Sequence, residues 1–388
     1  MRPGKSLQNV HICLVYDCLY PYTVGGGERW YRALAERLAT EGYEVTYLTL
    51  RQWEDDDAPS IPGVRIITAG PRSELYVDGR RRIGPALRFG VGVLRHLLRG
   101  GRRYDVVHSG STPFFPLLAA GLARRRGRYR LLVDWIEVWT LAYWKSYLGG
   151  LKGRIAWAIQ RLSTRVGERA FCFSRLHERR LLAEGFRGPV EVIGVYTGPL
   201  DRPEPERAEP VVVFAGRHIP EKGVLALPAA LARARETLPG LRGEILGDGP
   251  LRAEVERLVA EAGLNGAVSV PGFVPEDRVR DSIRRSLCLA LPSTREGYGL
   301  VVVEAAAQGV PSVVVQSPDN AALELVEDGV NGVVARSTEP DELAAAILRV
   351  HEAGPALRTS TADWFVQNGR QLSLESSLET VMRAYGRS

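Results

Sequence analysis

The hydrophobic positions of this chain fall into short apolar runs that alternate with amphipathic stretches from end to end. Runs of aliphatic residues bounded by glycine, proline or polar residues are typical of buried strands. In the first half they predict strands at 10–16, 44–50, 64–68, 104–109, 130–135, 170–174 and 190–194. In the second half they predict strands at 211–216, 243–247, 267–272, 287–292, 311–315 and 332–335. Helical patterns such as residues 28–42 lie between most of these strands.

This alternation predicts the fold class. Buried strands separated by helices indicate parallel sheets that are covered by helices on both faces. The segment 199–210 is rich in proline and charge and is interpreted as a linker between domain 1–198 and domain 211–354. Residues 355–388 have a helical pattern, and we expect them to return to the N-terminal domain. The prediction is therefore an α/β protein with two doubly wound, Rossmann-like domains facing a cleft, and with ligands at the C-terminal ends of the strands.

Composition and charge narrow the class of protein. The 388 residues are 45% hydrophobic and 25% charged, as in ordinary globular proteins. Residues 1–200 hold 31 Lys/Arg and 18 Asp/Glu, a net charge of +13, whereas residues 201–388 hold 20 and 27, a net charge of −7. The basic half indicates an anionic acceptor, a membrane surface or nucleic acid. No nucleic-acid-binding motif is evident, so we expect no nucleic-acid partner.

The cysteines and the apolar runs help to predict the cellular compartment of the protein. Cys13, Cys18, Cys172 and Cys288 form no CxxC pair, and three of them lie in strand-like runs. We interpret them as buried thiols of a protein in a reducing compartment. No signal-peptide pattern and no stretch long enough to span a membrane is evident. These features predict a cytoplasmic protein.

Two stretches of the basic half have open interpretations. Residues 80–103 are basic and amphipathic, like membrane-surface helices, although Pro85 and several glycines weaken the helix. Peripheral contact with an anionic membrane, on its inner face, therefore stays an alternative. An aromatic cluster with nearby lysines predicts either a core beneath a basic helix or an acceptor site that stacks on sugar rings or lipid tails; it comprises Trp135, Trp139, Tyr143, Trp144 and Tyr147.

Two motifs at strand ends suggest anion binding. GGGERW (25–30) opens a helix, where glycines let the backbone approach a ligand and N–H groups attract an anion; a tight turn explains it equally well. AGRHIPEKG (215–223) places Arg217 and Lys222 at a strand end. Two cations there can hold a diphosphate and neutralise its charge as it leaves, without a metal. We expect His218 to support this loop.

Three further motifs follow along the second half. GDGP (247–250) predicts a turn, with Asp248 as a weak candidate. VPGFVPEDRV (270–279) predicts a strand and a turn whose backbone either reads a base edge or only packs. STREGYGLVVVEAAAQGVP (293–311) carries two carboxylates around a helix start. Carboxylates repel phosphate but accept hydrogen bonds from sugar hydroxyls; the alternative is that they only complement the helix dipole.

Six motifs in this order resemble the retaining glycosyltransferases of family four, which have the GT-B fold. They read GGGER, GRHIPEKG, GDGP, GFVPEDR, EGYGLVVVEAAAQGVP and EDGVNGVV. The resemblance covers nearly the whole chain and is strongest over 211–335. It implies transfer of a sugar from a nucleotide-diphosphate sugar to an acceptor hydroxyl of a glycan, glycolipid or small molecule. It also implies retention by front-face attack, with no cofactor and no divalent metal.

The resemblance also implies roles for single residues. Arg217 and Lys222 would bind the donor diphosphate, Glu296 the hydroxyls of the transferred sugar, and Glu304 the ribose. Arg217, Lys222 and Glu296 are the implied catalytic residues. The implied donor site comprises Gly25, Gly26, Gly216, Arg217, Lys222, Phe273, Val274, Glu296, Gly299, Leu300, Val301 and Glu304.

The chain departs from the family at one place. Many members carry a histidine just after an N-domain strand, but here that position is Ile136, close to Asp134 and Glu137. Either carboxylate could orient the sugar or the acceptor, and Asp17 is a further acceptor-side candidate. His108 is interpreted first as a structural residue at a strand end, and its alternative role is to line the acceptor side. The departure leaves open a second interpretation, a catalytically weak or inactive protein that binds nucleotide sugars.

Overall fold

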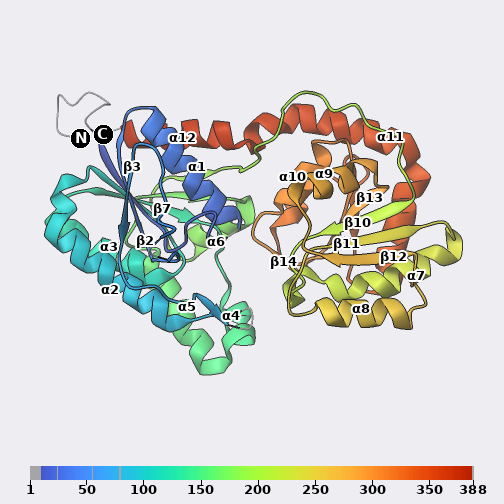
Figure 1. Ribbon diagram of the computed structural model, residues 1–388, viewed down its shortest axis with the longest axis horizontal. Coiled ribbons are helices and arrows are strands. Elements are labelled where there is room, and N and C mark those ends of the chain that lie inside the picture. Colours follow the sequence, from blue (N-terminus) through green and yellow to red (C-terminus); the bar gives the residue numbers. More distant parts are fainter. Residues whose placement is uncertain (1–9, 24, 55, 78–79, 387–388) are drawn as a thin grey trace. The chain divides into compact units, whose positions relative to one another are not determined.

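The computed structural model describes residues 10–23, 25–54, 56–77 and 80–386 (Figure 1). They form two compact units. One comprises the described residues up to Val195 and those from Leu374 onward, and the other is Tyr196–Ser373. The second unit therefore begins before the predicted linker and includes residues 355–373. Tyr196 explains this boundary, because its N–H donates to the Leu372 oxygen (3.0 Å) and its ring packs edge-on against Phe365 (5.4 Å).

The first unit is built on a parallel sheet in the order β3-β2-β1-β6-β7-β8-β9. Its strands are β1 (His11–Val15), β2 (Glu44–Thr49), β3 (Val64–Thr68), β6 (Val106–Gly110), β7 (Arg130–Trp135), β8 (Arg169–Cys172) and β9 (Val190–Val192). The two-residue strands β4 (Tyr76–Val77) and β5 (Arg80–Arg81) form a separate antiparallel pair. Its helices are α1 (Gly26–Thr40), α2 (Ile83–Gly100), η2 (Gly101–Arg103), α3 (Phe114–Gly127), α4 (Leu141–Leu148), α5 (Gly150–Ser163), α6 (Arg175–Ala183) and α12 (Leu374–Gly386).

The second unit repeats this plan with the sheet order β12-β11-β10-β13-β15-β17. Its strands are β10 (Val211–Ala215), β11 (Arg242–Leu246), β12 (Val268–Gly272), β13 (Cys288–Leu291), β15 (Ser312–Val315) and β17 (Gly332–Ala335). Its α-helices are α7 (Leu227–Thr237), α8 (Arg252–Glu261), α9 (Glu276–Arg285), α10 (Leu300–Ala306) and α11 (Pro340–Leu372). Short elements are η3 (Pro220–Lys222), η4 (Val224–Ala226), η5 (Ala321–Leu325), β14 (Arg295–Glu296) and β16 (Asp319–Asn320). Gly354, with φ 58°, breaks α11 into two segments.

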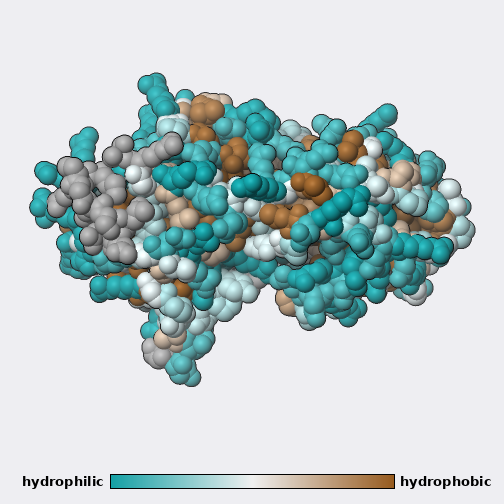
Figure 2. Space-filling view, turned by 90° about the horizontal axis from the view of Figure 1, so that it is seen from above, coloured by the Kyte–Doolittle hydropathy of each residue, from teal (hydrophilic) through white to brown (hydrophobic). Residues whose placement is uncertain are grey.

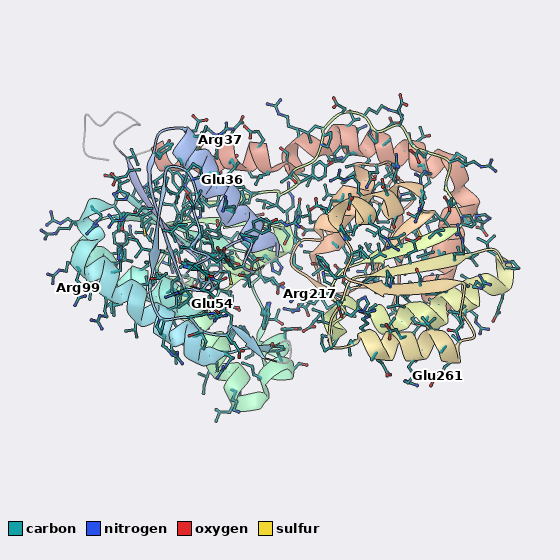
Figure 3. All side chains as sticks on the ribbon, viewed as in Figure 1. Glu36, Arg37, Glu54, Arg99, Arg217 and Glu261 are labelled. Atoms are coloured by element: carbon teal, nitrogen blue, oxygen red, sulfur yellow. The ribbon has the colours of Figure 1, made fainter. Side chains whose placement is uncertain are left out.

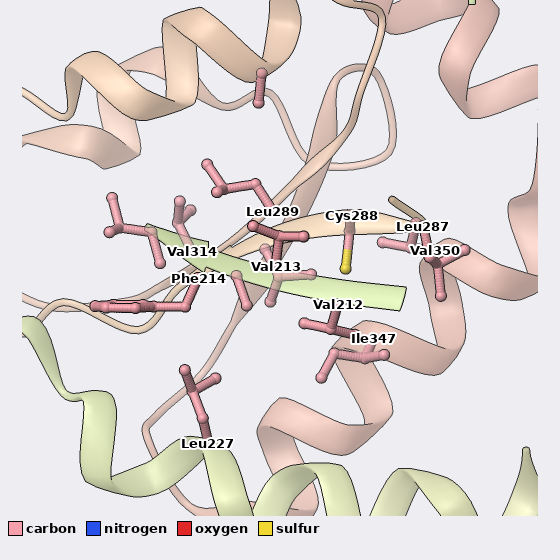
Figure 4. Packing of buried hydrophobic residues seen from close by; sticks show 14 of the residues in the cluster. Val212, Val213, Phe214, Leu227, Leu287, Cys288, Leu289, Val314, Ile347 and Val350 are labelled. Atoms are coloured by element: carbon pink, nitrogen blue, oxygen red, sulfur yellow. The ribbon is translucent and has the colours of Figure 1, made fainter. Parts of the chain in front are cut away.

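The core of the second unit lies on both faces of its central strands. Figure 4 shows Val212, Val213 and Phe214 of β10 among side chains of β13, α7 and α11. Parallel strands that are covered on both faces must be apolar throughout, which is why they appear as continuous hydrophobic runs in the sequence. All thirteen predicted sheet strands are present, with ends that differ by at most about two residues. The predicted fold class is confirmed.

The structure also shows where the cysteines lie and how polar the protein surface is. All four cysteines are buried, and burial raises the pKa of the Cys13 and Cys288 thiols to about 12. Figure 2 shows a largely hydrophilic face on which hydrophobic residues gather in small patches. Within the described ranges, no helix combines the length and the apolarity needed to cross a bilayer.

Candidate functional site

The sheet order of the second unit brings two sequence motifs together. β10 and β13 are neighbours, but the chain leaves β10 toward β11 and leaves β13 toward β15. The loops that follow such a pair of strands diverge, and the crevice that they leave is the usual ligand site of doubly wound sheets. Here these loops are 216–223 and 292–299. The strand order therefore places the predicted diphosphate motif beside the predicted sugar motif.

The central contact of this site joins Lys222 to Glu296. Lys222 Nζ donates to Glu296 Oε2 at 2.5 Å, and the two side chains are 20% and 12% exposed. Ser293 Oγ donates to the same carboxylate oxygen at 3.4 Å. Glu296 lies on β14, a two-residue strand that pairs with β16 and that the sequence did not predict. A fixed carboxylate thus holds the lysine at the ends of the strands.

Backbone contacts lock the two loops together. Gly223 has φ +64°, and a Cβ added there would come within 2.1 Å of the Pro292 carbonyl oxygen, so only glycine permits this approach. The Thr294 N–H donates to the Glu221 oxygen at 3.0 Å. The position of Lys222 is therefore determined by the end of β13 as much as by its own loop.

Arg217 and His218 follow β10 directly but have opposite environments. The Arg217 side chain is exposed and leaves the loop after β10 (Figure 3). His218 is fully buried, and burial lowers the pKa of its imidazole. The backbone N–H of His218 donates to the backbone oxygen of Asp248 (2.8 Å), and the backbone oxygen of His218 accepts from the Leu251 N–H (3.1 Å). His218 therefore supports the loop by joining it to the GDGP turn, as expected.

The start of α10 supplies the next part of the site. Gly299 precedes the helix with φ +100°, and the Val302 N–H donates to its oxygen at 2.9 Å. The N–H groups of Leu300 and Val301 lie at the helix start, where intrahelical acceptors are lacking. Glu304 lies one turn further along α10. Burial is the largest cause that raises the pKa of Tyr196 to about 12, and the negative charge of Glu304 is the second.

The GFVPEDR turn offers one exposed side chain and one buried one. Phe273 follows β12 and is 80% exposed, although exposed phenylalanines are uncommon without a partner. The Val274 side chain belongs to the hydrophobic core, so only its backbone is available to a ligand. The predicted donor contact of Val274 is therefore restricted to N–H and C=O.

The glycines of GGGERW have different surroundings. Gly25 caps α1, and a Cβ added there would approach Glu28 Oε2 within 2.5 Å. A Cβ added at Gly26 would meet nothing within 4 Å, whereas one at Gly27 would come within 3.2 Å of Ile136 Cδ1. The first turn of α1 therefore already carries a carboxylate that complements the helix dipole. The binding of a diphosphate by Gly25 and Gly26 stays a prediction.

A buried polar network occupies the end of β7. His108 Nε2 and Asp134 Oδ1 are 2.8 Å apart, and Trp30 Nε1 donates to Asp134 Oδ2 at 2.7 Å. The Tyr385 hydroxyl, from α12, lies 2.5 Å from His108 Nδ1. Both side chains of the His108–Asp134 pair are fully buried. The polar atoms of His108 and Asp134 thus join α1, β6, β7 and α12. This agrees with the structural role interpreted first for His108, and the acceptor-side role of either residue stays a prediction.

The remaining acceptor-side candidates differ in exposure. The Asp17 side chain is buried, and its predicted role stays a prediction. Glu137 is partly exposed, and its carboxylate accepts from Trp139 Nε1. Gln160, which the sequence did not single out, fixes this loop, because its Oε1 accepts from the Trp139 N–H and from Trp144 Nε1, each at 3.1 Å. A lone glutamine in an amphipathic helix carries no sequence signal for such a role.

We expect Asp134→Ala to destabilise the protein by about 3 kcal/mol, because the variant leaves His108 and the Trp30 N–H buried without their shared partner. Urea unfolding measures this loss. The matched control is Glu36→Ala, which removes an exposed pair with Arg32 on α1 and should change little. An equal loss in the two variants would contradict the role of the network.

Among the residues that the structure describes, no three His, Cys, Asp or Glu side chains come together as metal ligands do. The metal-free reaction stays a prediction.

The chain matches two family models. Residues 25–196 match the Glycosyl transferase 4-like domain, and residues 201–371 match Glycosyl transferases group 1. A D-inositol 3-phosphate glycosyltransferase of Actinosynnema mirum is 28% identical over 94% of this chain and 92% of its own length.

Two other relatives match over shorter segments. An alpha-D-kanosaminyltransferase of Streptomyces kanamyceticus is 31% identical over 40% of this chain, and the lipopolysaccharide core biosynthesis glycosyltransferase LpsE of Rhizobium meliloti is 30% identical over 51%. The matches span only 39% and 54% of these two relatives.

Solved structures show the same fold. Sucrose-phosphate synthase from Thermosynechococcus elongatus superposes with a TM-score of 0.78 at 20% identity, over 97% of this chain and 98% of that one. HepE from Anabaena, in complex with UDP and glucose, superposes with a TM-score of 0.69 at 19% identity, over 97% and 99%. At these identities the likeness concerns the fold alone.

Proposed function

Because the chain belongs to the GT-B glycosyltransferases, we propose that it transfers a sugar from a nucleotide-diphosphate sugar to an acceptor hydroxyl, with retention and without a divalent metal. The observation that carries this proposal is the contact of Lys222 with Glu296. It lies beyond β10 and β13 of the second unit, the neighbouring strands that the chain leaves in opposite directions. The cation that would stabilise a leaving diphosphate is thus hydrogen-bonded to the carboxylate that would bind a sugar.

The charges of the loop after β10 serve the leaving group. As the bond between the anomeric carbon and the diphosphate oxygen breaks, negative charge develops on that oxygen. Lys222 and Arg217 stabilise this charge, and the Leu300 and Val301 N–H groups donate to the phosphate oxygens. The acceptor oxygen attacks from the same face, and its proton passes to the departing phosphate oxygen.

Glu296 orients the sugar in this proposal. Its carboxylate is paired with Lys222 and accepts from Ser293. When the donor binds, hydroxyls of the transferred sugar donate to the carboxylate while Lys222 turns toward the diphosphate. Glu304 accepts from the ribose hydroxyls, and the exposed ring of Phe273 packs on the base.

The donor base, the acceptor and the compartment are parts of the same proposal. HepE was solved with UDP and with UDP-glucose, so a uridine nucleotide is the first donor to test. The acceptor class is a glycan, a glycolipid or a small molecule, and Glu137 is the acceptor-side carboxylate with an exposed part. The buried position of the cysteines supports action in a reducing cytoplasm.

Ile136 favours a second candidate function, the binding of nucleotide sugars without turnover. The side chain that stands at the position of the family's histidine is apolar, and it lies against Gly27 at the start of α1. Such a side chain offers no hydrogen bond to a transferred sugar.

We expect a thermal-shift screen with UDP, GDP, ADP and their sugar derivatives to raise Tm for one base. Ligand at 100 times its Kd stabilises the folded state by about 2.7 kcal/mol. Release of free nucleotide, followed in the presence of a panel of acceptors and of a chelator, then distinguishes the two functions. Turnover that survives the chelator supports the metal-free transferase. Binding without turnover supports the second candidate, and no shift with any nucleotide contradicts both.

A further inference from the structure

The exposed side of α5 carries a line of apolar residues flanked by Lys152, Arg154 and Arg161. Leu151, Ile155 and Leu162 are 73%, 53% and 52% exposed, and their spacing places them on one line of the helix. The buried residues of α5, Gly153 and Gln160 among them, lie on the opposite side. A helix on the surface of a globular protein normally presents polar residues outward, so this line needs an apolar partner.

The neighbouring helix α4 continues this surface. None of its residues is buried, which corrects the interpretation of its aromatic side chains as core; of the predicted cluster, only Trp135 is fully buried. Tyr147 and Leu148 are each 37% exposed. The ring of Trp139 lies edge-on to Tyr147, with centroids 5.3 Å apart.

The two helices form a hairpin, residues 141–163. Gly149, with φ +86°, turns the chain between them. A Cβ added at Gly153 would come within 2.4 Å of the Trp144 carbonyl oxygen, so α5 packs tightly on α4. The exposed residues Tyr147, Leu148 and Leu151 therefore surround the turn of this α4–α5 hairpin.

The same layer of helices concentrates exposed apolar residues. Among the described residues, ten of the fourteen exposed large hydrophobic side chains lie on α2, α3, α4 and α5. Those of α2 are spaced as one stripe along the helix. The ten are Ile83, Leu87, Val91, Leu98, Leu122, Tyr147, Leu148, Leu151, Ile155 and Leu162.

The charge of these four helices has one sign. They contain no Asp or Glu, and they carry ten Lys or Arg residues. Arg99 of α2 points outward in Figure 3, and Lys145 and Lys152 flank the hairpin turn. The ten are Arg88, Arg95, Arg99, Arg124, Arg125, Arg126, Lys145, Lys152, Arg154 and Arg161.

We propose that the α4–α5 hairpin, together with the exposed stripe of α2, docks on the surface of a bilayer that contains anionic lipids. The apolar side chains enter the boundary between headgroups and acyl chains, where Trp and Tyr are also favoured. The Lys and Arg residues beside them attract the lipid phosphates. A second copy of the chain is disfavoured as the occupant, because two such surfaces would bring like charges together.

The test is co-sedimentation of the full chain with two kinds of vesicle, phosphatidylcholine alone and phosphatidylcholine with phosphatidylglycerol. We expect binding to the anionic vesicles only, and weaker binding as salt is raised. The double variant Leu151→Glu/Ile155→Glu should lower the affinity by at least about tenfold. Leu151→Ser/Ile155→Ser, which adds no charge, should lower it less but measurably.

The matched control is Leu182→Glu/Val366→Glu, which adds the same charge at two exposed apolar positions on α6 and α11. It should bind like the unchanged protein. Absence of binding to anionic vesicles, equal binding to both vesicle types, or equal loss in the control would each overturn the proposal. A dimer in sedimentation velocity that only the hairpin variants lose would assign the surface to self-association instead. Circular dichroism checks that each variant is folded.

Discussion

Lys222→Ala is expected to lower kcat by about 10²–10³-fold, the usual cost of removing one charged group that stabilises a developing anion. The ammonium lies at the strand ends, held by Glu296 at 2.5 Å, so it is positioned before the donor binds. Alanine leaves the diphosphate charge to Arg217 and to the N–H groups of α10. Steady-state assays of nucleotide release measure the loss.

Two variants control for this result. Lys222→Arg keeps the charge but changes its geometry, so it should recover activity only in part. Arg233→Ala removes an exposed cation of the same unit, paired with Asp341 on α11, and should leave kcat unchanged. The Lys222 and Glu296 side chains are only 20% and 12% exposed, so Lys222→Ala also leaves a largely buried carboxylate without its partner; urea unfolding checks that the variant is folded under the assay conditions. Activity close to that of the unchanged protein in Lys222→Ala would disprove its assignment.

Glu296→Gln is expected to separate sugar transfer from nucleotide binding. Turnover should fall by about 10²-fold, because a neutral amide accepts weaker hydrogen bonds from the sugar than a carboxylate does. The Kd of the nucleoside diphosphate without sugar should stay the same or become tighter, because Lys222 loses the carboxylate that now neutralises it. Lys222→Ala should raise the same Kd, so only the lysine variant should weaken nucleoside diphosphate binding.

Isothermal titration calorimetry with the nucleoside diphosphate measures this difference. The control is Glu221→Gln, which removes a carboxylate of the same loop that pairs with Arg295 rather than with Lys222, and it should preserve both turnover and binding. If Glu296→Gln weakens nucleoside diphosphate binding as much as Lys222→Ala does, Glu296 only positions the lysine. That outcome would contradict the proposed contact of Glu296 with the sugar.

The predicted fold was correct because its information is local. A strand that is buried on both faces must be apolar along its length, so each of the thirteen strands appears as a run of apolar residues without any knowledge of its neighbours. The motifs that follow β10 and β13 were also found locally, because glycines and charges at strand ends differ from the apolar runs before them. The two-residue strand that carries Glu296 was missed, since it is formed only by pairing with residues 319–320.

Side-chain environment was predicted less well. Asp134 looks like an accessible group at a strand end, but it is fully buried beside His108, which Tyr385, 277 positions further along the chain, contacts from α12. The aromatic residues of α4 look like core residues in the sequence, yet no residue of this helix is buried. Burial depends on which distant element packs on a given face, and one short stretch of sequence does not contain that information.

The sequence by itself determined the α/β class, the strands, the division near residue 200 and the residue types of the donor motifs, because periodicity and turn residues encode local structure. Only the tertiary structure decided that Lys222 contacts Glu296, 74 positions away, since the strand order brings their loops to one point. It likewise decided that an apolar and basic layer of helices remains exposed. Contacts and exposure arise from packing between distant elements, and the chemistry of this chain depends on both.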